Sequence, residues 1–530
     1  MGKNRKPSHG RSDLSEQRRG SESVHNNKYE EDNCFSPMLD STEPQATKGR
    51  PLPGRRKSLV ERLTKRKMSM QMKKSISLMQ VTASLIAVTG HTAIFITPSS
   101  ILENTGALGL SLIIWLFGGI INWMQALIFV EFGTSLDEAG GTYSYVRAAC
   151  GPLAGFMMLW SYMMLSTGPF WSFLGYTAAM YSVKPVFPDC PPPEGLVKLL
   201  AAILILLLAF LNCFCKKLVS KIQIYLSATK IIALLVIIAG GAVRAYQGHT
   251  ENIVPIFENR ITDPGPLALS ILYSVFAFGG WQVVMSLVEE MEDPAKDLPR
   301  GVTITFIVTI TKYILTLLAY MTLLTKHEVL QSNAVALLYI QRLYHPLTIM
   351  ISACVAFTSV GALNASVMGH SRVLFAAARH KAAPLLFGML HIKYLTPWPS
   401  IWVLCAWSLV VLYSGGMDFL LDLVSFISCL VALVIAVALI YYKIKQPNVK
   451  RPYKVPMWMP VSHALFFSAV LALGIYQKPN QMLAGVVISL LGYPIYLLGI
   501  CWQPKPRAFT KKMEYITVTC QKLLNLRKSV

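Results

Sequence analysis

The chain is poor in charged residues, and it lacks the motifs that mark most enzymes. Only 14% of its 530 residues are charged and 53% are hydrophobic, whereas soluble domains carry about 25% charged residues. It contains no glycine-rich nucleotide loop and no nucleophile–base spacing, and it lacks the alternating segments of roughly ten residues that build a membrane β-barrel. We therefore expect no catalytic residue, no cofactor and no metal, and neither a soluble domain nor a barrel.

Apolar runs of about 20 residues fill most of the chain instead. That length is what an α-helix needs to cross a hydrocarbon core of roughly 30 Å. The sequence therefore predicts an all-α polytopic membrane protein with 12 transmembrane helices. Their expected limits are 77–100, 107–132, 146–182, 196–215, 219–245, 265–291, 301–325, 345–380, 398–414, 417–443, 459–476 and 480–502.

The formal net charge of +22 is concentrated at the two ends of the chain. Residues 1–75 carry 18 Lys or Arg, and the segment after Trp502 carries seven more. This placement is typical of topogenic charge rather than of nucleic-acid binding, so we expect no nucleic-acid partner. The basic runs of the N-terminal segment could also contact anionic membrane lipid.

Three basic loops indicate the topology. They cover 216–221, 379–393 and 443–454, and all fall on the same side of the membrane as the N-terminus. Because cytoplasmic loops are rich in Lys and Arg, both termini are predicted to be cytoplasmic.

Three regions follow from this organisation. Residues 1–74 are expected to form a disordered basic cytoplasmic N-terminus, because their polar composition cannot bury a core. Residues 75–502 would form the twelve-helix membrane domain, and 503–530 a cytoplasmic C-terminal tail.

Two of the apolar runs look interrupted. The first contains "TGHTAIFITP" (89–98) and the sixth contains "FAFGGWQ" (276–282). The interruptions fall at corresponding positions of two five-span halves, which is typical of a transporter built from an inverted repeat with a binding site near the midplane. Non-helical backbone at that depth is tolerated only where it lines a cavity or is buried in protein.

Six motifs in order resemble the light chains of heteromeric amino acid transporters, the L-type group of the amino acid–polyamine–organocation superfamily. They are "IFITPSSILENTGALGLSLIIW" (94–115), "EAGGTYSYV" (138–146), "FAFGGWQ", "EEMEDPAKDLPRG" (289–301), "GALNASVMGHSRVLFAAAR" (361–379) and "RPYKVPMWMPV" (451–461). The resemblance implies a LeuT-like 5+5 inverted repeat, with discontinuous helices 1 and 6 and two further helices. It also implies sodium-independent exchange of neutral L-amino acids across the plasma membrane.

The same resemblance implies a partner, a single-span type II glycoprotein heavy chain. Cys190 lies in the predicted external loop 183–195 and matches the cysteine through which the family's light chains form a disulfide with the heavy chain. From the residues alone, Cys190 could also be an unpaired exposed thiol or pair within the chain, but the predicted topology places no other cysteine in an external loop, which favours an intermolecular partner. The only N-x-S/T sequence, at 364–366, falls inside a predicted span, so no external loop offers a glycosylation site.

The family holds the substrate's α-carboxylate with amides freed at the first break and its ammonium with backbone carbonyls of both breaks. At the sixth-span break, Gly279 and Gly280 supply the flexible backbone and Phe276 matches the aromatic gate over the substrate. Phe278 stands where the family usually has Tyr, and Gln282 stands where the L-type group often has Asn.

The first-span break departs from the family pattern, in which Gly-Ser-Gly precedes Ile-Phe. This chain loses both glycines, although Gly90 and the threonines could still open the helix. The residues expected to bind substrate here are Thr89, Gly90, His91, Thr92, Ala93 and Ile94.

His91 has two interpretations. It could be a neutral histidine bonded to neighbouring backbone or hydroxyl groups, or it could contact substrate as a donor or proton-sensitive group.

Lys230 matches the family's fifth-span lysine, which braces the first and eighth helices where sodium-coupled relatives hold an ion. The alternative is a lysine that extends its ammonium to the membrane edge.

We therefore expect an amino acid exchanger working by alternating access. The altered first break keeps a second possibility open, a membrane protein with little transport activity that acts as an amino acid sensor or as a structural partner of the heavy chain.

Overall fold

A computed structural model describes most of the chain from residue 77 onward. The described residues are 77–90, 92–136, 141–187, 190–253, 256–258, 260–282, 285, 288, 291–332, 334–502 and 505–528. The chain divides into two units, residues 1–50 and 51–530, and the second unit holds all of the described residues. The predicted N-terminal region 1–74 lies outside the described residues, as does His91.

Nine helical segments within the described residues are long and apolar enough to cross a membrane. The prediction of an all-α polytopic membrane protein is therefore confirmed. The segments are Leu78–Phe95 (helix α2, Leu78–Val88, with the turn η1, Thr92–Phe95), α4 (Leu108–Ser135), α8 (Glu194–Phe214), α9 (Lys216–Tyr246, counted from Ala228), α11 (Pro294–Met321), α14 (Leu347–Arg379), α16 (Met417–Lys445), α17 (Trp458–Gln477), and the run of α18 (Pro479–Leu490), α19 (Gly492–Tyr496) and η6 (Leu497–Cys501).

The three other predicted spans are helical too, but each is shorter or interrupted. The third consists of α6 (Pro152–Ser161), the π-helical turn η2 (Tyr162–Thr167) and α7 (Gly168–Val183). The sixth begins with α10 (Pro264–Ala277), which stops at a break, and the ninth is α15 (Trp398–Ser414) with 17 residues. The twelve-span layout stays a prediction.

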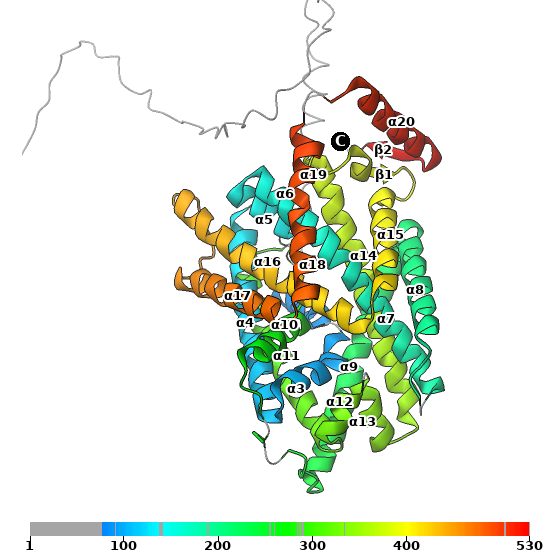
Figure 1. Cartoon of the computed structure of the whole chain (residues 1–530), viewed down its shortest axis with the longest axis vertical. Helices are drawn as coiled ribbons and strands as arrows, with labels where there is room; N and C mark the ends of the chain where they lie inside the picture. Colours follow the sequence, from blue (N-terminus) through cyan, green and yellow to red (C-terminus); the bar gives the residue numbers. More distant parts are fainter. Residues whose placement is uncertain are drawn as a thin grey trace, which may run out of the picture. The chain divides into compact units, whose positions relative to one another are not determined.

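Several elements between the spans have no counterpart in the predicted set. They are α3 (Thr97–Thr105), which follows the first break, α5 (Gly141–Cys150), η3 (Lys184–Val186), α12 (Lys326–Gln331), α13 (Val335–Leu343), η5 (Leu385–Gly388), α20 (Arg507–Leu523) and the strands β1 (Met389–His391) and β2 (Leu526–Lys528). The strands pair antiparallel, with Leu390 opposite Arg527. The C-terminal segment is thereby attached to the connection between α14 and α15, and α20 lies next to both strands (Figure 1).

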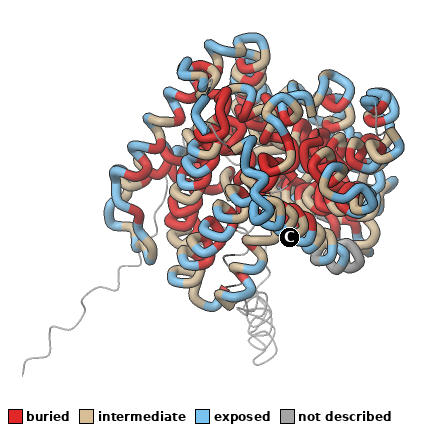
Figure 2. Tube along the Cα trace, turned by 90° about the horizontal axis from the view of Figure 1, so that it is seen from below, coloured by how far each residue is buried: buried red, intermediate tan, exposed pale blue. Residues whose placement is uncertain are grey.

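Outer helices expose apolar side chains, as a lipid environment requires. Buried residues lie in the interior of the helical bundle, and exposed ones lie along its outer helices (Figure 2). Helix α8 shows this most clearly, because its exposed large residues recur every three or four positions along one face. They are Leu196, Leu199, Ile203, Leu206, Leu207 and Phe210.

Two carboxylates are buried among these helices, and each is matched by a cation. Glu131 of α4 is 2.9 Å from the Lys443 ammonium and accepts the Val455 amide at 2.8 Å. Asp422 of α16 accepts from Lys478 at 2.8 Å and from the Tyr273 hydroxyl at 2.6 Å. Such pairing is what allows a charge to be kept out of water.

Candidate functional site

The first span is broken at the predicted place. Helix α2 ends at Val88, and Gly90 has a left-handed φ of 64° before the chain resumes as η1 and α3. Only glycine adopts this conformation freely. The Tyr313 hydroxyl of α11 donates to the Gly90 carbonyl at 2.6 Å, and a Cβ at position 90 would lie 1.9 Å from that hydroxyl oxygen. Backbone conformation and close approach therefore both require glycine here.

The second break follows α10. The helix ends at Ala277, and Gly280 adopts a φ of 99°. The Gly279 amide donates to the Phe276 carbonyl at 2.9 Å, and the Gly280 amide donates to Oε1 of Gln282 at 3.0 Å. The Gln282 side chain thus satisfies a backbone amide that the break has released from the helix.

The two breaks are joined to each other. The Gly90 amide donates to the Gly279 carbonyl at 2.7 Å, across 189 positions of sequence. The non-helical parts of both spans therefore meet at one place inside the bundle, as the paired interruptions predicted.

A cavity of about 120 Å³ opens beside the two breaks. Engineered apolar cavities of about 150 Å³ bind benzene, so the space suits a small organic molecule. The lining residues are Ala87, Val88, Thr142, Tyr162, Ser166, Phe170, Gln223, Lys230, Phe276, Gly279, Gly280, Gln282, Thr358, Ala362, Ala365, Ser366, His370, Val424, Ile427, Ser428 and Val431. They come mainly from α2, η2, α7, α9, the second break, α14 and α16.

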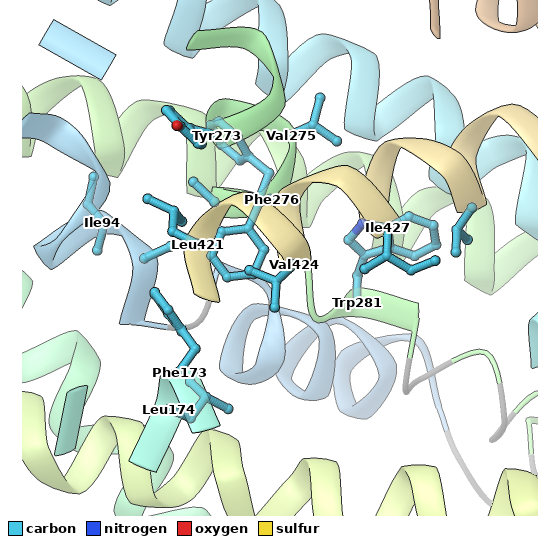
Figure 3. Packing of buried hydrophobic residues seen from close by; sticks show 14 of the residues in the cluster. Ile94, Phe173, Leu174, Tyr273, Val275, Phe276, Trp281, Leu421, Val424 and Ile427 are labelled. Atoms are coloured by element: carbon cyan, nitrogen blue, oxygen red, sulfur yellow. The ribbon is translucent and has the colours of Figure 1, made fainter. Parts of the chain in front are cut away.

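Five residues expected at the site line this cavity: Phe276, Gly279, Gly280, Gln282 and Lys230. Phe276 is 3% exposed, and its ring packs edge-on against Phe173 of α7 with centroids 5.2 Å apart. In Figure 3 the Phe276 ring points toward α16, where Leu421 and Val424 lie. An aromatic side chain therefore forms part of the wall beside the second break.

The other expected residues that the structure describes lie around the breaks without lining the cavity. Phe278 packs against Trp115 and Tyr313, with ring centroids 5.9 and 5.1 Å away. Ala93 and Ile94 are fully buried in η1. The hydroxyls of Thr89 and Thr92 are buried and have no hydrogen-bond partner among the described residues, so they remain available at the first break.

Lys230 of α9 attaches to the end of α2. Its ammonium donates to the carbonyls of Thr89 at 2.9 Å, Ala87 at 3.0 Å and Ile86 at 3.4 Å. An ammonium has three donors, so the group is fully used on carbonyls that the break leaves without helical partners. Its burial, with 1% of the side chain exposed, is incompatible with a lysine reaching for the membrane edge.

A second lysine lies nearby. Lys312 of α11 is close enough to Lys230 for their charges to interact. Its ammonium is buried, and no hydrogen-bond partner for it occurs in the described part of the chain.

Comparison with known proteins agrees with this geometry. The model of the family described as "Amino acid permease" matches residues 76–500. The chain belongs to the amino acid permease family. It is 34% identical over 455 residues to "Large neutral amino acids transporter small subunit 2" of Rattus norvegicus, covering 85% of each chain. It is 32% identical over 456 residues to the human "Cystine/glutamate transporter", covering 86% of this chain and 91% of the relative.

A further relative is the human "Asc-type amino acid transporter 1", 32% identical over 455 residues, with 85% of this chain and 87% of the relative covered. The resemblance to light chains of heteromeric transporters is confirmed by these relatives. Family and relatives together identify a multi-pass amino acid transporter, not an enzyme.

The permease cavity has walls that the sequence did not point to. Tyr162, Ser166 and Phe170 come from the third span, and His370 comes from α14. Of these four residues, Tyr162 and Ser166 carry a local structural sign of function. Both lie in the π-helical turn Tyr162–Thr167, and such turns often occur at functional sites. The "STGP" sequence at 166–169 marks a helix irregularity, but nothing in it reveals that the turn faces α14.

Cys190 lies in the loop between α7 and α8. It is exposed and forms no disulfide with any described cysteine. Its carbonyl accepts from the Lys184 ammonium at 3.0 Å. The thiol of this permease is thus free of partners in the described chain, while its pairing with another protein stays a prediction.

Proposed function

We propose that this permease exchanges neutral L-amino acids without sodium, by alternating access, as the light chain of a disulfide-linked heterodimer in the plasma membrane. The observation that carries the proposal is the meeting of two helix breaks at one cavity, joined by the Gly90–Gly279 hydrogen bond. We further propose the twelve-span 5+5 inverted-repeat layout, with both termini cytoplasmic.

Amino acid recognition follows from the polar groups at the breaks. The α-carboxylate would bind at the first break, where the hydroxyls of Thr89 and Thr92 are unused among the described residues and the half-helix α3 begins. The ammonium would bind at the end of α10, because the carboxyl end of a helix carries partial negative charge. His91 falls within this segment but outside the described residues, so its part in binding remains a hypothesis from the sequence.

The charge of the cavity favours neutral side chains. The described residues of its lining include no Asp or Glu, which argues against cationic amino acids. Lys230 is the only Lys or Arg in that described lining, and its three donors are used by backbone carbonyls. A second carboxylate on the substrate would therefore find no cation ready to pair with it there.

Sodium independence follows from the same lysine. The Lys230 ammonium holds three carbonyls at the end of α2, which are the kind of oxygen ligands that a metal cation would need. A fixed positive charge at this position makes a bound sodium ion unnecessary.

The proposed heavy-chain partner rests on Cys190 and on the names of the relatives, one of which is called a small subunit. An exposed cysteine that is unpaired in the described chain is available for an intermolecular disulfide. Co-expression with a heavy chain should give a high-mass band on a non-reducing gel. The band should disappear in Cys190→Ser, and its persistence in that variant would remove the proposal.

Exchange is tested with the purified heterodimer in liposomes. We expect labelled neutral amino acids to enter faster when the lumen holds unlabelled substrate, and sodium replacement by choline to leave the rate unchanged. A sodium requirement would overturn the role of Lys230. Surface-expressed protein that moves no amino acid from a broad panel would favour the sensor or structural partner.

A further inference from the structure

The cavity wall contributed by the third span contains a directional hydrogen-bond chain. Tyr162 and Ser166 both lie in the π-helical turn η2 and line the cavity, and their spacing of four residues places them on the same side of the helix. Tyr162 faces His370 of α14, and His370 in turn faces Trp171 of α7. A selective role for this chain rests on the proposed function, because it concerns the side chain of the transported amino acid.

The direction of the chain is fixed at its buried end. The indole Nε1 of Trp171 donates to Nδ1 of His370 at 3.1 Å, with the two rings within 4° of coplanar. Indole nitrogen can only donate, so Nδ1 accepts and a neutral His370 carries its proton on Nε2. Nε2 lies 3.1 Å from the Tyr162 hydroxyl oxygen and therefore donates to it.

The chain ends in a hydroxyl at the cavity. Tyr162 accepts from His370, so its own O–H remains to be donated. Ser166 also hydrogen-bonds Tyr162, and both residues line the cavity. Whichever of these two hydroxyls is last, one O–H group is left to donate toward an occupant.

Acceptors are supplied by the helices α14 and α16. Two serine hydroxyls in the lining donate back to their own helices: Ser366 to Ala362 at 2.8 Å and Ser428 to Val424 at 2.6 Å. Their protons are used, so their oxygens can offer only lone pairs to the cavity. The cavity therefore presents a donor from η2 and acceptors from α14 and α16.

The amide oxygens of the side chains in the lining are already used. Oε1 of Gln282 accepts the Gly280 amide, and Oε1 of Gln223 accepts from Asn364 at 2.6 Å. Lys230 has no donor left. A side-chain carboxylate, which only accepts, would match the donor but leave the two serine oxygens without a proton to bind.

We propose that this cavity selects neutral amino acids whose side chain both accepts and donates a hydrogen bond, a carboxamide or a hydroxyl. Apolar side chains of the same shape would leave the donor of η2 unsatisfied in a buried site, which is costly. Trp171 and His370 act as positioning residues that orient the terminal hydroxyl.

Isosteric substrates test the proposal. Inhibition constants of asparagine, leucine and aspartate are measured against exchange in liposomes, together with the pair threonine and valine. Asparagine should bind about tenfold tighter than leucine, because sites built to hydrogen-bond a group discriminate against isosteres that lack it. Aspartate should be weaker than asparagine.

Variants test whether the hydrogen-bond chain from Trp171 to the cavity causes the preference for asparagine over leucine. Tyr162→Phe combined with Ser166→Ala should bring the inhibition constants of asparagine and leucine close together, because it removes the hydroxyl donor that distinguishes the two side chains. The Trp171 side chain does not line the cavity. Trp171→Phe should nevertheless reduce the preference for asparagine in part, because His370 can then carry its proton on either ring nitrogen. Tyr176→Phe, on α7 and outside the lining, serves as matched control and should behave as wild type.

The outcomes separate the two proposals. If wild type exchanges amino acids but binds leucine as tightly as asparagine, the side-chain proposal is wrong and the proposed function stands. If the double variant binds every substrate more weakly by the same factor, these hydroxyls would be assigned to the α-carboxylate that all substrates share. That result would also overturn the side-chain proposal. A wild type without any exchange would defeat the proposed function itself.

Discussion

Replacing Gly90 by alanine should disrupt the junction of the two helix breaks. The residue has φ 64°, and a Cβ there would lie 1.9 Å from the hydroxyl oxygen and 2.7 Å from Cζ of Tyr313. Both contacts are shorter than the 3.0 Å that side chains tolerate. Either Tyr313 or the backbone at Gly90 must therefore move.

The cost has two parts. A left-handed conformation costs a residue with a Cβ about 1–2 kcal/mol. Moving the Tyr313 hydroxyl away also breaks its 2.6 Å bond to the Gly90 carbonyl, and leaving buried partners unsatisfied costs about 1–3 kcal/mol. Together these terms predict a loss of roughly 2–5 kcal/mol.

The matched control is Gly141→Ala. Gly141 has a similar φ of 58°, but no atom of the described residues lies within 4 Å of a Cβ built on it, so only the first part of the cost applies. We expect the apparent unfolding temperature of the purified protein in detergent to fall clearly further for Gly90→Ala than for Gly141→Ala. Exchange in liposomes should be lost only in Gly90→Ala.

Equal effects of the two substitutions would refute the close-approach reasoning. A second test adds Tyr313→Phe to Gly90→Ala. Removing the hydroxyl relieves the shortest contact but leaves Cζ too near, so stability should be recovered in part. A double variant no more stable than Gly90→Ala would show that Tyr313 is not the obstacle.

Three further predictions concern lysines and a histidine. Lys230→Met should lower the stability of the folded protein by about 3–6 kcal/mol, because the two shortest hydrogen bonds of Lys230, at 2.9 and 3.0 Å, are charge-assisted. Sodium should not restore exchange in this variant. Unchanged exchange would contradict the role of Lys230 in holding the end of α2. Lys312→Met should raise the apparent unfolding temperature, because it removes a buried ammonium that has no acceptor in the described chain. Removing this group should stabilise the protein by about 1–3 kcal/mol. A lower unfolding temperature would instead show that the ammonium has a stabilising partner. Burial and the charge of Lys393 lower the pKa of His391, whose Nδ1 accepts two amides. The contribution of neutral His391 is therefore full above its unfolded pKa of about 6.5 and is lost as the pH falls toward the folded pKa. Hydrogen exchange at 526–528, corrected for its intrinsic pH dependence, should accelerate below that pH in wild type but not in His391→Asn, whose amide oxygen keeps an acceptor; identical profiles would exclude this role.

Much of the fold could be predicted because a membrane imposes length and hydrophobicity on each helix. Each of the twelve apolar runs contains a helix among its described residues, and both breaks lie where glycines interrupt the runs, since positive φ at Gly90 and Gly280 needs a residue without a Cβ. The short helices α12 and α13 and the amphipathic α20 were missed. They lie outside the apolar runs, so length and hydropathy carry no signal for them.

The cavity walls were predictable only in part. Residues near the breaks follow from local sequence, and five of those expected line the cavity. Tyr162, His370 and Trp171 are brought together by packing between α14 and the third span, across 199 positions between Trp171 and His370. One sequence does not contain that information. The proposed side-chain preference therefore rests on the structure and not on the sequence.

Because of the hydrogen bond between Gly90 and Gly279, the exchange of a single backbone amide proton can report on the transport cycle. The proton on the Gly90 nitrogen is shielded while the two half-helices stay together. If the two broken helices separate during each turnover, exchange of this proton with deuterated water would accelerate in proportion to the rate of cycling. With an isotope label in the Gly279 carbonyl, the infrared band of that carbonyl would shift whenever the hydrogen bond breaks.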